Sequence, residues 1–112
     1  LNKVAARYVQ QVDKAGVVRD QTAALGVAGE HIFAFWKETE ERRTDAGVIA
    51  KDADYLECAF TAKEYAEQGH DLASDWTKNV HAALKTNSAR ALFDRMIIMD
   101  SNDWWQGLKK LS

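Results

Sequence analysis

The stretch AGVIAKDADYLECAFTAKEYAEQG, residues 46–69, decides the fold, because apolar and small residues recur along it at helical spacing without a proline. At about 100° of rotation per residue, it forms one narrow apolar stripe. The members of that stripe are Ile49, Ala53, Leu56 and Phe60. A second face carries small residues and a tyrosine, namely Ala50, Cys58, Thr61 and Tyr65. A helix with two such faces is typical of the middle of a domain. We therefore predict a central helix over 45–68.

Two aspartates, Asp52 and Asp54, interrupt this helix. On the helical wheel Asp52 lies about 60° from the apolar stripe and Asp54 about 140° from it, on the second face. The two side chains point about 160° apart, so they cannot both ligate one metal ion. A buried carboxylate has to be paired, hydrogen-bonded, protonated or bound to a metal. The residues alone leave two interpretations: an ion pair or cap for one aspartate with partial exposure of the other, or a metal ligand at one of them.

The rest of the chain predicts an all-α fold in one domain or part of one. It has no proline and few glycines, and no stretch alternates over strand length. Helices are expected near 1–14, 17–25, 28–43, 45–68, 71–85, 88–99 and 101–110. Leu56 and Trp76 are expected in the core. Of the adjacent Trp104 and Trp105, we expect one to anchor the last helix to the core and the other to cover a neighbouring element.

Composition excludes several classes of function. The 112 residues carry a net charge of −2, which gives no reason to expect nucleic acid or an anionic membrane as the main partner. No apolar run approaches the roughly 20 residues that span a bilayer. The charged, amphipathic start does not predict a signal peptide. The single Cys58 excludes an internal disulfide and a thiolate zinc cluster, and it fits a reducing, cytoplasmic setting. Because the first residue is Leu1, we expect a trimmed or excised piece of a longer chain.

The block AKDADYLECAFTAKEYAEQG, followed by DWTKNVHAALKTNSARALFDRMI and DWW, resembles the C-terminal half of HD-domain metal-dependent phosphohydrolases. The nearest branch contains 5′-deoxynucleotidases of the YfbR kind. The opening LNKVAARYV resembles the segment that follows the family's His-Asp doublet, so the resemblance covers nearly the whole chain. Its most specific part is KDADYLE. The resemblance implies an orthogonal multi-helix bundle, of which residues 1–112 form the C-terminal part.

In that family a first histidine, a His-Asp doublet and a distant aspartate hold a divalent metal. Only the distant aspartate maps onto this chain, and it maps onto Asp54. The resemblance therefore implies that Asp54 is a metal ligand. Asp52 would then pair with a base such as Arg42 or Arg43, or emerge at the helix edge. The histidine and the doublet are expected to precede Leu1.

The chain has a His-Asp dipeptide of its own, His70-Asp71, but it follows Asp54 instead of preceding it. Gly69 before it is typical of a helix stop, and Asp71 of a cap on the next helix. Glu67 with His70 also matches half of a di-iron carboxylate motif, but the sequence holds no second copy. We interpret both matches as coincidence.

The function that the resemblance implies is that of part of a divalent-metal-dependent phosphohydrolase acting on small phosphomonoesters, with nucleoside 5′-monophosphates as the leading candidates. The ion would be Mn, Co, Ni, Zn or Mg. The chain alone is expected to be inactive, because its partner in the domain is the missing N-terminal segment. Lys51 is a candidate to meet phosphate. The alternative is a non-catalytic helical module that binds a protein through Trp104 and Trp105. The substrate and the choice between monomer and homodimer stay open.

Overall fold

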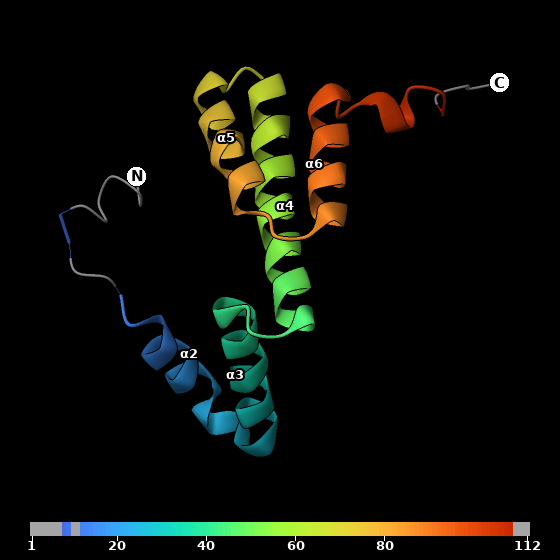
Figure 1. The fold of residues 1–112 in the computed structure, drawn as a ribbon. Coiled ribbons are helices and arrows are strands. Elements are labelled where there is room, and N and C mark those ends of the chain that lie inside the picture. The colour runs from blue at the N-terminus through green and yellow to red at the C-terminus, as the bar shows by residue number, and fades with distance from the viewer. Residues whose placement is uncertain (1–7, 10–11, 109–112) are drawn as a thin grey trace.

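The computed structural model describes residues 8–9 and 12–108, and this part of the chain is all-α, without strands. Figure 1 shows α4 in the middle, with α5 and α6 along its C-terminal half and with α2 and α3 near its other end. The helices are α2 (Lys14–Thr22), α3 (Gly26–Glu41), α4 (Asp45–Glu67), α5 (Ser74–Ala83) and α6 (Asn87–Ile98). Short 3₁₀ turns occupy Ala23–Leu25, Asp71–Ala73 and Asp103–Trp105.

The predicted central helix is confirmed, and local capping explains its bounds. The Thr44 side chain accepts a hydrogen bond from the Gly47 N–H at 3.0 Å and so starts α4. At the other end Gly69 adopts a φ of 100°, a left-handed conformation that stops the helix. The helix expected at 88–99 is also confirmed, shifted by one residue because Thr86 is its cap.

Other expected helices differ from the structure. The second helix begins at Lys14 rather than at residue 17, because the Asp13 carboxylate accepts a hydrogen bond from the Gly16 N–H at 2.9 Å. The helix expected over 101–110 is a single 3₁₀ turn within the described residues. The helix expected over 1–14 lies largely outside the described residues, and residues 8, 9, 12 and 13 are not helical.

Close approach of neighbouring helices requires glycine at two positions. A Cβ atom at Gly47 would lie 2.3 Å from the carbonyl oxygen of Glu38, where α3 meets the start of α4. A Cβ atom at Gly29 would lie 2.0 Å from the carbonyl oxygen of Thr22, where α3 meets α2. Both glycines therefore bring consecutive helices into backbone contact.

The core is small and lies between α4, α5 and α6. Its buried members are Leu56, Ala59, Val80, Leu84, Ala89, Phe93 and Met96, with Tyr55 packed against them. Leu56 is buried as predicted. The rest of the predicted stripe is not: Ile49 is 61% exposed, and Ala53 and Phe60 also face solvent.

The buried face of α4 is the one that carries Asp52, Ala59 and Ala62. The two alanines let α5 and α6 approach the backbone closely, and the aspartate finds hydrogen-bond donors there. The predicted burial of Trp76 is wrong as well, because its side chain is half-exposed on α5. Trp104 is 76% exposed, whereas Trp105 is partly buried.

The helices are spread out rather than gathered around one centre. The radius of gyration is 17.9 Å, whereas a compact domain of about 100 residues has about 13 Å. Much apolar surface is left uncovered as a result. None of the described helices combines the length and the apolar character that crossing a bilayer would need.

Candidate functional site

Asp52 is the most completely bonded polar side chain at the centre of the fold. It is only 2% exposed. Its carboxylate accepts hydrogen bonds from the backbone N–H of Lys85 at 3.0 Å and of Thr86 at 2.8 Å. It also forms an ion pair with the Arg42 guanidinium. Of the outcomes expected for Asp52, which were pairing with Arg42 or Arg43 or emergence at the helix edge, the structure shows pairing with Arg42.

These contacts control the ionisation of Asp52. Burial alone would raise its pKa, because it disfavours the charged form. The hydrogen bonds from Thr86 and Lys85 and the charge of Arg42 outweigh burial and hold the pKa of Asp52 below its ordinary value. Asp52 is therefore an anion whose bonding capacity is used within the fold.

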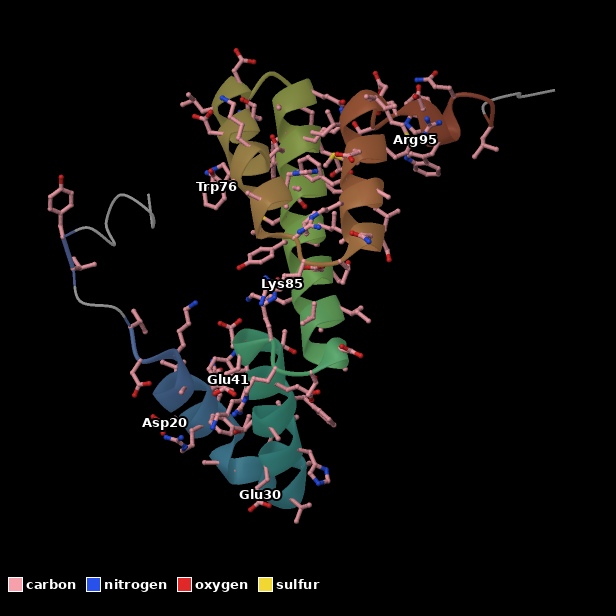
Figure 2. All side chains as sticks on the ribbon, in the orientation of Figure 1. Asp20, Glu30, Glu41, Trp76, Lys85 and Arg95 are labelled. Carbon is pink, nitrogen blue, oxygen red and sulfur yellow. The ribbon has the colours of Figure 1, made fainter. Side chains whose placement is uncertain are left out.

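Arg42 connects the end of α3 to the hydrogen-bonded groups around Asp52. It ends α3 in a left-handed conformation, with a φ of 51°. From there its Nη1 donates to the Ala83 carbonyl at 3.0 Å, and its guanidinium lies 5.6 Å from the Tyr55 ring centroid. The Arg42–Asp52 pair thus ties the α3–α4 turn to the connection between α5 and α6, where Figure 2 labels Lys85.

Asp54 has a different environment. Its side chain is 63% exposed, and its Oδ2 lies 3.1 Å from the Nζ of Lys51. Lys51 is only 15% exposed and also donates to the Oε1 of Glu40 at 2.5 Å. Burial would lower the pKa of Lys51, but the hydrogen bonds and charges of Glu40 and Asp54 raise it. One oxygen of Asp54 is therefore held by a fixed ammonium group on the same helix.

Among the described residues, Asp54 is the candidate donor for the implied metal site. Within residues 8–9 and 12–108, no three His, Cys, Asp or Glu side chains gather where they would hold an ion. Asp54 fits as a single exposed oxygen donor, and its role as a ligand stays a prediction. His70 lies elsewhere, with its ring edge-on to Tyr65 at a centroid distance of 5.8 Å.

A cavity opens along the same face of α4, after Asp54. It has a volume of about 260 Å³ and lies between α4 and α5. Its lining includes Cys58, Thr61 and Tyr65 from α4 and Trp76 from α5. Figure 2 shows Trp76 on the outer side of α5. The sequence predicts the small residues on this face of α4, but it does not predict that Trp76 of α5 lines the same cavity.

Comparison with known proteins gives one similarity. The chain is 30% identical over 71 residues to the 5′-deoxynucleotidase HDDC2 of Dictyostelium discoideum. The matched residues make up 63% of this chain and 37% of that relative, so the chain spans well under half of the relative's length. No family model matches the chain, and no solved structure matches it.

Proposed function

We propose that the chain is part of a divalent-metal-dependent phosphohydrolase of the HD-domain family that acts on small phosphomonoesters, and in particular on nucleoside 5′-monophosphates. The similarity to a 5′-deoxynucleotidase is the observation that carries the proposal. The contrast between the two aspartates supports the proposal. The carboxylate of Asp52 is buried and bonded within the fold, whereas the carboxylate of Asp54 is exposed to solvent. A cytoplasmic setting, argued from the single Cys58, belongs to the same proposal.

Asp54 would be the residue of this chain that holds the ion. A bound divalent metal, whether Mn, Co, Ni, Zn or Mg, would supply the charge that polarises a phosphate and lowers the pKa of a water molecule. Lys51 fixes Oδ2 of Asp54 and so orients the carboxylate. The other donors would come from the N-terminal part of the same domain. The exposed stripe with Ile49 and Phe60 offers that part an apolar surface to cover.

The matched pair of aspartates tests the proposal in the complete protein. Asp54→Ala should abolish both metal binding and hydrolysis of nucleoside 5′-monophosphates, because the ion loses an oxygen ligand. Asp52→Ala should act mainly on stability. Bound metal and turnover would be measured under conditions where both variants remain folded.

Two results would contradict this assignment. If Asp52→Ala loses the metal and Asp54→Ala keeps it, then Asp52 is the ligand, and the family's metal-binding aspartate was aligned with the wrong residue by two positions. If neither variant loses it, the chain carries no metal ligand at either aspartate. The helical partner-binding module then becomes the better explanation.

A further inference from the structure

The ammonium group of Lys51 lies between two carboxylates that come from different helices. Its Nζ is 2.5 Å from Oε1 of Glu40, in the last turn of α3, and 3.1 Å from Oδ2 of Asp54 on α4. The lysine side chain is only 15% exposed, and its Nζ lies 5.4 Å from the ring centroid of Tyr55. Lys51 therefore has little freedom to move, and Glu40 holds it more closely than Asp54 does.

The formal charges of these three side chains bear on whether Asp54 attracts a cation. Glu40 and Asp54 each carry a negative charge and Lys51 a positive one, so the three together keep one net negative charge. Without Glu40, Lys51 and Asp54 would form a neutral pair, and the ammonium would compete with a metal ion for the carboxylate. With Glu40 present, the ammonium is shared between two carboxylates, and the exposed one keeps its attraction for a cation.

The other contacts of this end of α3 do not serve Asp54. Lys14 lies 3.9 Å from Oε2 of Glu40, but its side chain is 73% exposed, and ion pairs this exposed contribute little. The next residue, Glu41, forms its ion pairs with Lys37 at 3.8 Å and with Arg43. The two adjacent glutamates are thus a matched pair, of which Glu40 reaches α4 and Glu41 pairs near its own position in the chain.

We infer that Glu40 is a positioning residue for the metal site, which holds Lys51 in place and shares its charge, so that the carboxylate of Asp54 stays oriented and attractive to the ion. The inference rests on the proposed function and deepens it. It extends the machinery around the metal from α4 to the end of α3. Glu40 acts through Lys51 and does not touch the ion itself.

The metal affinity of the complete protein tests Glu40, with Mn²⁺ as the probe and titration calorimetry as the measurement. Glu40→Gln should weaken binding about tenfold, because Lys51 loses the carboxylate that shares its charge. Glu41→Gln removes the same charge at the neighbouring position and should leave the affinity unchanged. An unchanged affinity in Glu40→Gln would overturn the inference. So would a similar loss in both variants, since that would reflect only the missing negative charge.

A double variant shows whether Glu40 acts through Lys51. Lys51→Met alone should also weaken binding about tenfold. Adding Glu40→Gln to it should cost nothing further, because there is no ammonium left for Glu40 to hold, and the two effects are then not additive. A loss of about a hundredfold in the double variant, the product of two independent effects, would overturn the inference.

The ammonium of Lys51 also gives a readout that needs no metal. Protons of a buried, hydrogen-bonded group exchange slowly with water, so proton–nitrogen NMR of the metal-free complete protein should detect this ammonium. The signal should persist in Glu41→Gln and disappear in Glu40→Gln, and its persistence in Glu40→Gln would overturn the inference. If the unaltered protein binds no Mn²⁺, the proposed function fails instead, and the NMR signal alone decides whether Glu40 holds Lys51.

Discussion

Two aspartates that are two positions apart have opposite environments, since Asp52 is buried and Asp54 is exposed. Asp52→Ala should destabilise the chain by about 3–5 kcal/mol, since it leaves the Arg42 guanidinium without its anion in a largely buried place. Asp54→Ala removes an exposed side chain and should change stability by no more than about 0.5 kcal/mol. Urea unfolding of both variants, followed by circular dichroism, gives the two values. Equal losses would contradict the assigned environments.

Asp52 should also make stability depend on pH. Its folded pKa lies below its ordinary value of 3.8, so its contribution is present above about pH 4 and is lost as the pH falls through the folded value. Asp52→Asn should flatten this acid limb of the stability curve. Urea midpoints measured between neutral and strongly acid pH would check it. An acid limb as steep as that of the unaltered chain would assign the loss to other carboxylates.

Lys51 is expected to position Asp54, and Lys63 provides a matched control on the same helix. The two lysines are 15% and 17% exposed, and each pairs with a carboxylate. In the complete protein Lys51→Met should weaken metal binding about tenfold, because the ligand loses the group that orients it. Lys51→Arg should keep most of the affinity and Lys63→Met all of it. Titration calorimetry measures each. Tighter binding by Lys51→Met would mean that the ammonium competes with the ion.

At the scale of single elements, the sequence predicts where helices lie better than it predicts which faces they bury. Helical spacing and the absence of proline suffice for α4 and α6. The wheel of α4 favours the stripe with Ile49 and Phe60 because that stripe is the more apolar one. The structure buries the face with Asp52 instead, and the backbone N–H groups that donate to Asp52 belong to residues more than 30 positions away. Local patterning does not contain that information.

The candidate site could also be predicted only in part from the sequence. The KDAD block makes Asp54 a predicted ligand through the family resemblance, and that prediction stays untested. The cost of burying a lone charge predicts a partner for a buried Asp52, but the sequence leaves Arg42 and Arg43 open as that partner. The cavity was not predictable, because its lining combines residues of α4 with the half-exposed Trp76 of α5. From the sequence, this tryptophan was expected in the core.

The junction of α3 and α4 should tolerate no side chain at Gly47. Gly47→Ala places a Cβ atom against the Glu38 carbonyl, so the two helices must separate, at a cost of about 1–3 kcal/mol. Gly107→Ala is the control, because a Cβ atom there meets nothing within 4 Å. Thermal unfolding of the two variants would show the difference. A neutral Gly47→Ala would mean that the junction is looser than the structure indicates.

At the scale of the whole molecule, the exposed stripe of α4 should behave differently in the isolated chain and in the complete protein. Ile49→Asp changes an exposed residue of the chain and should cost no more than about 0.5 kcal/mol there. If the rest of the domain covers this stripe, the same change buries an unpaired charge and should destabilise the complete protein by more than 1 kcal/mol, roughly. Denaturant titrations of both forms provide the comparison. Equal effects would show that nothing covers the stripe.

The bonds that join Asp52 to the connection between α5 and α6 also bear on the order of folding. Asp52 and Thr86 are 34 positions apart in the chain. Helices that follow one another directly, such as α2 and α3, meet after closing only a short loop, whereas this bond has to close a much longer one. We therefore expect the helical pairs to form early and the corner around Asp52 to form last. The same corner would then be the first part to open when the protein unfolds.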